Sequence, residues 1–245
     1  MTPDEQKQAI RDAFASLNIS LSSIQTEQLL AFYEMIVEKN KVMNLTSITG
    51  FSDFVIKHYL DSLIFSDKVL ARYPSKRIRM IDIGTGAGFP GVPMKIVYPE
   101  LDTVLLDSLN KRLPFLNDAI SDLNLQNIRT VHYRAEDGAR DKGLREKFDL
   151  VVSRAVANMS TLSEYCIPYV KMNGYFTAYK SIASEEELEK AEPAIQLLGG
   201  KVEEVLTGKI PNTDIEREII LIKKVHSTPG KYPRKAGTPL KNPLS

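Results

Sequence analysis

The stretch Asp82-Ile83-Gly84-Thr85-Gly86-Ala87-Gly88-Phe89-Pro90-Gly91-Val92-Pro93 begins at the end of a strand-like run, 78–83, and decides the fold. Glycine has no Cβ, so it accepts positive φ and lets a ligand approach the backbone closely. A helix is expected directly after this turn, and the free N–H groups of its first turn favour an anionic group. The stretch therefore predicts a ligand-binding turn between a strand and a helix. A purely structural turn is the alternative.

The chain on either side of this turn alternates between short β-rich runs and helical stretches. The expected strands are 78–83, 103–106, 128–133, 150–152 and 175–178, and the expected helices between them are 89–97, 111–123 and 161–170. Such alternation is typical of a parallel, doubly wound α/β sheet. A helix over 185–198 then leads to two strands, 201–206 and 217–224, which are too close together for a crossover and should be antiparallel. A mostly parallel sheet that ends in an antiparallel hairpin differs from the standard dinucleotide-binding domain.

Two further regions flank this α/β domain. Apolar residues at helical spacing, such as Ile10, Phe14 and Leu17, predict an N-terminal helical cap that ends at Tyr73-Pro74-Ser75. The expected organisation is a cap over residues 1–75, the main domain over 76–225 and a basic tail over 226–245.

Composition limits the class of protein. Hydrophobic residues make up 43% of the 245 and charged residues 26%, as in ordinary globular proteins. No apolar run approaches the ~20 residues that span a bilayer, and the acidic start of the chain is unlike a signal peptide. Cys166 is the only cysteine, which excludes an intrachain disulfide and a cysteine-clustered metal site. A cytoplasmic protein without a membrane partner or a bound metal is expected.

Charge is distributed unevenly along the chain. The first 218 residues carry 26 basic and 31 acidic side chains, whereas the last 27 carry six basic and no acidic ones. A basic tail suits a polyanion, and its candidates for phosphate contacts are Lys231, Arg234, Lys235 and Lys241. A solubilising, frayed terminus is the alternative.

Polar residues also follow the later strands. Asp107 ends the second strand, 21 residues after Gly86, where an acid can accept hydrogen bonds from ribose hydroxyls; a helix N-cap is the alternative. Arg154 comes just past the fourth strand and is a candidate for a carboxylate or a phosphate, with a surface salt bridge as the alternative. Lys180 after the fifth strand and His58 in the cap are candidates for contact with a nucleic acid. Both residue types are also common as structural side chains.

The glycine turn fits one ligand class better than another. Position 89 is Phe, so the dinucleotide spacing G-x-G-x-x-G lacks its last glycine. The run resembles instead the acid-x-G-x-G-x-G signature of class I methyltransferases. The wider chain resembles one family closely, the bacterial 16S ribosomal RNA guanine-N7 methyltransferases, also called glucose-inhibited division protein B. The strings that carry this resemblance are Asn44-Leu45-Thr46, HYLDSL from His58, GTGAGFPGVP from Gly84, LLDSLNKR from Leu105, RAED from Arg134, SRAVA from Ser153 and PRKAGTPLKNPL from Pro233.

The resemblance implies a class I methyltransferase that takes S-adenosyl-L-methionine as cofactor and methylates guanine N7 in 16S ribosomal RNA of the small subunit. We expect the chain to act as a monomer. It implies cofactor contacts at Gly84, Phe89, Ala135, Glu136 and Arg154, to which the motif analysis adds Asp82, Gly86, Gly88 and Asp107. No general base is expected, and Arg154 and Lys180 are the candidates for a catalytic role. Two other classes stay open at this point: a nicotinamide-dependent oxidoreductase, and a non-catalytic RNA-binding or ribosome-assembly factor with the same fold.

Overall fold

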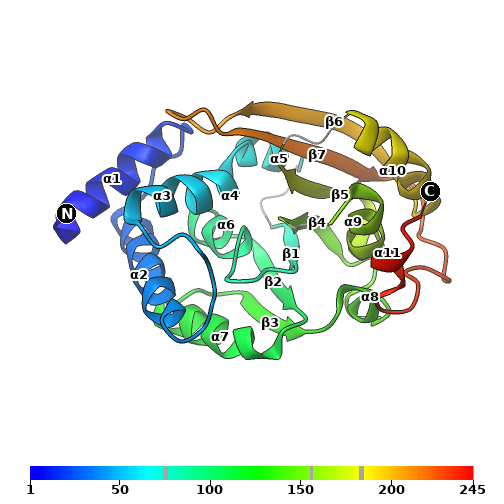
Figure 1. Ribbon diagram of the computed structural model, residues 1–245, viewed down its shortest axis with the longest axis horizontal. Helices are drawn as coiled ribbons and strands as arrows, with labels where there is room; N and C mark the ends of the chain where they lie inside the picture. Colours follow the sequence, from blue (N-terminus) through cyan, green and yellow to red (C-terminus); the bar gives the residue numbers. More distant parts are fainter. Residues whose placement is uncertain (74–76, 155–156, 182–184, 245) are drawn as a thin grey trace.

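A seven-stranded sheet in the order β3-β2-β1-β4-β5-β7-β6 forms the centre of the molecule (Figure 1). It is seen in a computed structural model that describes residues 1–73, 77–154, 157–181 and 185–244. The strands are β1 (Arg79–Ile83), β2 (Asp102–Asp107), β3 (Ile128–His132), β4 (Phe148–Ser153), β5 (Val170–Lys180), β6 (Gly200–Lys209) and β7 (Glu216–Lys224). Neighbouring strands among β1 to β5 pair in parallel, whereas β7 pairs antiparallel with both β5 and β6. This confirms the expected doubly wound α/β sheet with a C-terminal antiparallel hairpin.

Helices cover both faces of the sheet because alternate strand residues supply two separate cores. Met80, Leu105 and Leu150 pack into the core on the side of the N-terminal helices, and their neighbours Ile81 and Val104 pack into the other. The helices that follow the strands are α6 (Gly91–Val97), α7 (Leu113–Asp122), α8 (Ala135–Gly138), α9 (Met159–Cys166) and α10 (Glu185–Leu197), with 3-10 turns at Asn110–Arg112 and Ile167–Tyr169. In Figure 1, α2, α6 and α7 lie on one side of the strands, and α8, α9 and α10 lie on the other.

The end of the helix expected over 161–170 was predicted wrongly. Helix α9 ends at Cys166, a 3-10 turn follows, and Val170 already belongs to β5. Pro168 lies in this turn, and proline has no N–H to continue an α-helix. Strand β5 is therefore longer than the expected run 175–178.

The N-terminal cap is helical, as expected. It comprises α1 (Pro3–Ala15), α2 (Ser23–Asn40), α3 (Phe51–Phe54), a π-helical segment (Val55–Leu60), α4 (Asp61–Leu63) and α5 (Ser66–Leu70). Capping boxes at Thr2 and Ser22 satisfy the first N–H groups of α1 and α2. The Gln25 side chain donates to the carbonyls of Ile96 and Val97 at the end of α6, which joins the cap to the sheet domain. Of the predicted cap boundary, Tyr73 is described, whereas Pro74 and Ser75 lie outside the described residues.

The C-terminal residues 226–244, here called the strap, fold against α8 and α9 and contain the short helix α11 (Thr238–Lys241) (Figure 1). Arg145 donates to the carbonyls of Thr228 and Tyr232, at 2.8 and 2.9 Å. Thr161 of α9 donates to the carbonyl of Pro239 at 3.0 Å. The strap thus extends from Arg145, which precedes β4, to the first turn of α9, which follows the carboxyl end of β4.

Among the described residues, no helix combines the length and the apolar character needed to cross a bilayer.

Candidate functional site

The glycine turn has the backbone that its sequence predicts. Gly84, Gly86 and Gly88 adopt φ values of +72°, +62° and +103°, which side chains rarely accept. A Cβ on Gly88 would also lie 2.8 Å from Cγ2 of Val92. The amide of Gly84 donates to the carbonyl of Leu106 at 2.9 Å, so the turn is held at the ends of β1 and β2.

Asp82 holds the glycine turn in place through hydrogen bonds to Thr85 within it and to Gly91 just after it. Its carboxylate is fully buried and accepts hydrogen bonds from the Thr85 hydroxyl at 2.7 Å and from the Gly91 amide at 2.9 Å. Burial raises the pKa of Asp82 to about 6, although both hydrogen bonds and the positive charge of Arg154 oppose that rise. The Gly91 amide is the first N–H of α6. Because it donates to Asp82, this N–H is not free to bind an anionic group of a ligand.

Asp107 at the end of β2 is also almost fully buried. One carboxylate oxygen accepts from the Gly86 amide at 2.8 Å and from Arg112 at 3.2 Å, and the other accepts from the Leu109 amide at 2.8 Å. The residue therefore ties the glycine turn to the loop after β2. It is not a helix N-cap, because the 3-10 turn that follows begins at Asn110 and has Leu109 in its N-cap position.

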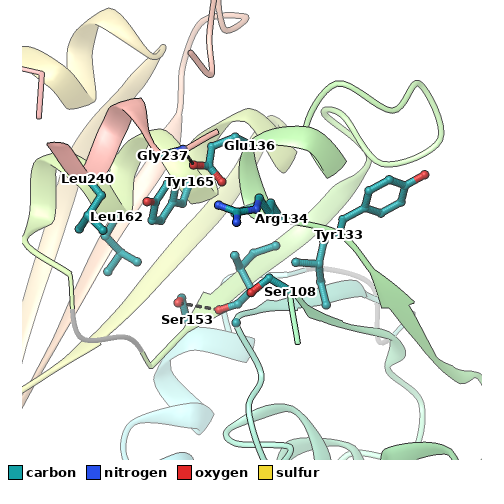
Figure 2. A pocket seen from close by; sticks show the side chains of 13 residues that line it. Ser108, Tyr133, Arg134, Glu136, Ser153, Leu162, Tyr165, Gly237 and Leu240 are labelled. Atoms are coloured by element: carbon teal, nitrogen blue, oxygen red, sulfur yellow. Dashed lines mark hydrogen bonds between the residues drawn. The ribbon is translucent and has the colours of Figure 1, made fainter. Parts of the chain in front are cut away.

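A pocket of about 260 Å³ opens at the carboxyl ends of the parallel strands (Figure 2). Three of the predicted cofactor residues, Gly84, Ala135 and Glu136, line it. Residues of β1, β2, α9 and the strap form apolar walls, and the loop after β3 forms a polar edge. The other lining residues are Ile83, Leu106, Ser108, Tyr133, Arg134, Ser153, Leu162, Tyr165, Gly237 and Leu240. Apolar faces beside a carboxylate, next to an open glycine turn, fit an adenosine group.

The sequence did not predict that residues of the strap line this pocket. Gly237 and Leu240 line it, and the Gly237 amide donates to a Glu136 carboxylate oxygen at 2.7 Å (Figure 2). The string from Pro233 was noted in the sequence, but its basic residues pointed only to RNA. Only Gly237 itself, a residue suited to a left-handed backbone, was a signal for a close approach.

A second polar cluster lies between the cap and the sheet. Arg154 donates to Asp61 at 2.9 Å and lies 3.2 Å from Nδ1 of His58, with its guanidinium 5.1 Å from the centre of the Phe89 ring. The His58 ring stacks on Phe89 with centroids 4.5 Å apart, and its Nε2 lies 2.8 Å from the Thr46 hydroxyl. Burial, and then the charge of Arg154, lowers the pKa of His58 to about 4, so this ring is neutral at pH 7.

Phe89 and Arg154 thus lie together in this cluster. Neither lines the pocket, although Ser153, the residue before Arg154, does. Asp61 also pairs with Arg217 of β7, a partner that the sequence did not indicate. The string SRAVA from Ser153 is described only in part, since Ala155 and Val156 lie outside the described residues.

The remaining candidates have these positions. Lys180 is mostly buried and pairs with Glu187 at 2.6 Å. Lys231, Lys235 and Lys241 of the strap are exposed, whereas Arg234 forms an ion pair with the fully buried Glu164 at 2.7 Å. Within the ranges that the structure describes, no group of three or more His, Cys, Asp or Glu side chains is arranged to hold a metal ion.

The sheet order with its reversed strand β7, and a glycine turn at the end of β1, define a class I methyltransferase, an enzyme class whose methyl donor is S-adenosylmethionine. Two solved structures share the fold at low sequence identity. A mutant of MtNAS superposes with a TM-score of 0.53 at 14% identity and covers 91% of this chain and 87% of its own. NSun6 from Pyrococcus horikoshii gives a TM-score of 0.52 at 15% identity, over 69% of this chain and 52% of its own.

Sequence comparison identifies the family. The family model GidB, described as rRNA small subunit methyltransferase G, matches residues 25–220. Ribosomal RNA small subunit methyltransferase G of Lachnoclostridium phytofermentans is 52% identical over 94% of this chain and 93% of its own length. The protein of the same name from Acetivibrio thermocellus is 44% identical over 99% of this chain and all of its own. The chain belongs to the rRNA small subunit methyltransferase G family.

Proposed function

We propose that this enzyme transfers a methyl group from S-adenosylmethionine to N7 of a guanine in the 16S RNA of the small ribosomal subunit. The family and the names of its relatives support an rRNA substrate. The observation that carries the proposal is the pocket at the carboxyl ends of the strands, where an open glycine turn meets apolar walls and the Glu136 carboxylate.

Residues of the pocket and the glycine turn can be assigned to separate parts of the cofactor. Bound there, the cofactor supplies a methyl group already activated on a sulfonium. We assign the adenine to Ala135 and Glu136, and the ribose hydroxyls to Asp107, whose carboxylate ends β2. Further residues shape the turn or complete the site, namely Asp82, Gly84, Gly86, Gly88, Phe89 and Arg154.

No proton transfer is needed for this reaction. Guanine N7 presents a lone pair in the plane of its ring, so the protein has only to orient two reactants. Cys166 is fully buried at the end of α9, and burial raises the pKa of its thiol, which argues against a covalent route. His58 is neutral and bonded on both ring nitrogens, which fits a structural role better than that of a general base.

Arg154 and Lys180 are proposed as orienting residues, with two targets for Arg154: the cofactor carboxylate or an RNA phosphate. Asp61 and His58 hold the Arg154 guanidinium in one place, which suits a fixed anionic group. Lys180 is held in the same way by Glu187.

RNA contacts are proposed for the strap. Lys231, Lys235 and Lys241 are exposed around the segment that lines the pocket, so their charges lie where RNA would approach. Arg234 is assigned mainly to holding Glu164. We further propose the division into cap, main domain and tail, and a monomer that acts in the cytoplasm, where ribosomal subunits are assembled.

Calorimetry tests the cofactor assignment and separates the alternatives. S-adenosylmethionine should bind with one site per chain, and NAD, the control, should not bind. Binding of NAD alone would support the oxidoreductase. Cofactor binding without methyl transfer to ribosomal subunits would support a non-catalytic assembly factor.

A further inference from the structure

The strap meets the cofactor pocket at one hydrogen bond. Glu136 is almost fully buried, at 5% exposure, and one of its carboxylate oxygens accepts from the Gly237 amide at 2.7 Å. Figure 2 shows the Glu136 carboxylate turned toward the strap and close to Tyr165. A glutamate in a four-residue helix has several rotamers open to it, so a fixed donor decides where its charge lies.

Gly237 can make this bond because of its backbone. It adopts φ +82° and forms the N-terminal boundary of α11. An added Cβ would meet nothing within 4 Å, so conformation rather than space makes glycine necessary. Asparagine tolerates the left-handed region better than alanine does, which provides a conservative substitution.

The strap holds Gly237 in place through anchors on both sides. Before it, Arg234 makes its ion pair with buried Glu164 and also donates to the carbonyl of Asn242 at 2.7 Å. After it, the carbonyl of Pro239 accepts from Thr161 at 3.0 Å. The amide is therefore part of a fixed frame rather than of a loose terminus.

We propose that Gly237 is a positioning residue of the cofactor site: its amide orients the Glu136 carboxylate toward the exocyclic amine of the adenine, so the strap takes part in cofactor recognition. The proposal rests on the function assigned above and goes beyond it, because it gives a C-terminal segment a role in cofactor selectivity. Glu136 acts as the acceptor, and Gly237 acts through it.

The test compares two ligands by calorimetry: S-adenosylhomocysteine, and its analogue in which hydrogen replaces the adenine amino group. The wild-type chain should prefer the amine by about tenfold or more, since the analogue leaves a buried acceptor unpaired. Gly237→Ala should reduce this preference to about threefold or less, and Gly237→Asn should restore most of it. Gly230→Ala is the matched control, because Gly230 lies in the same strap with open space and an ordinary φ.

Thermal unfolding of each variant accompanies the binding data. A general loss of stability would weaken both ligands alike and leave their ratio unchanged. A wild-type ratio in Gly237→Ala, or equal losses in Gly237→Ala and Gly237→Asn, would overturn the proposal while leaving the proposed function in place. A wild-type chain that binds neither ligand would overturn both.

Discussion

Asp107 connects three parts of the site, since its carboxylate accepts from Gly86, Leu109 and Arg112. We expect Asp107→Ala to weaken S-adenosylmethionine binding by roughly 1.5 to 3 kcal/mol, or about one to two decades in Kd, because a buried charged acceptor is removed. Binding of 16S RNA should change much less. Calorimetry measures the first effect and filter binding the second. Asp102→Ala, at the half-exposed start of the same strand, is the control. Unchanged cofactor affinity in Asp107→Ala would remove Asp107 from the site.

Asp82 makes stability depend on pH in a direction opposite to that of most carboxylates. Its pKa is about 6 in the fold against an ordinary 3.8, so the stability it contributes is complete below about pH 4 and is lost as the pH rises through 6. The cost at pH 8 is about 3 kcal/mol. Asp82→Asn keeps an acceptor for Thr85 and Gly91. In urea unfolding, the free energy of unfolding of Asp82→Asn relative to that of the wild type should therefore increase from pH 5 to pH 8. A difference that is the same at both pH values would contradict this account.

His58 bears on the pH dependence of the reaction. With its pKa lowered to about 4, it stays neutral throughout the range in which an ordinary histidine titrates. Guanine N7 needs no deprotonation, so the single-turnover rate should vary little between about pH 6.5 and 8.5. Rapid-quench kinetics with labelled cofactor provide the measurement. A rate that falls tenfold per pH unit below 7 would show that a general base takes part.

Among the elements, the strap depends on a buried ion pair. Glu164 is fully buried, and Arg234 accounts for its charge. Arg234→Ala should cost about 3 to 5 kcal/mol in the free energy of unfolding, since it leaves an uncompensated buried carboxylate. Adding Glu164→Gln to that variant should recover part of the loss. Lys231→Ala, an exposed neighbour, should change stability by less than about 0.5 kcal/mol in the same urea titrations. A small loss in Arg234→Ala would mean that the strap is not anchored there.

Sequence patterns predicted most elements because their periodicity is local. Most predicted strands and helices begin and end within about three residues of the observed ones, although β5 begins well before its predicted start. The hairpin of β6 and β7 was predicted from the short connection between the two strands. The π-helical turn over Val55–Leu60 and the early end of α9 were not predicted, since each depends on packing or on a single proline. The strap was predicted only as a basic tail, because its contacts are to residues about 70 to 100 positions away, such as Glu164 and Glu136.

At the scale of the whole molecule, one part of the candidate site could be predicted from the sequence and another part could not. The family resemblance implied Gly84, Ala135 and Glu136, and these three residues line one pocket, as expected for residues that follow the strands of a parallel sheet. Spacing could not show that Phe89 would stack on His58, or that Asp61 would pair with both Arg154 and Arg217. Those interactions join the cap to the sheet, and no local pattern encodes them.

The affinity for RNA and its dependence on salt should depend on the exposed lysines of the strap. Replacing Lys231, Lys235 and Lys241 together with Gln should weaken binding of 16S RNA and reduce the slope of log K against log salt by roughly 0.7 to 0.9 for each phosphate that the protein no longer neutralises. Cofactor affinity should be retained, since these side chains are exposed. The control replaces Lys39, Lys41 and Lys68 of the cap in the same way. An unchanged salt slope in the strap variant would show that its lysines only solubilise the chain.

The central claim is that the molecule methylates guanine N7 in small-subunit RNA. The most direct measurement incubates the pure protein with S-adenosylmethionine labelled in its methyl group and with separated ribosomal subunits, then maps the label. We expect transfer to 16S RNA alone, at a guanine where reduction followed by mild base treatment cleaves the strand, as it does at 7-methylguanosine. A label on the large-subunit RNA, a methylated product that resists this cleavage, or no transfer to any subunit would contradict the account.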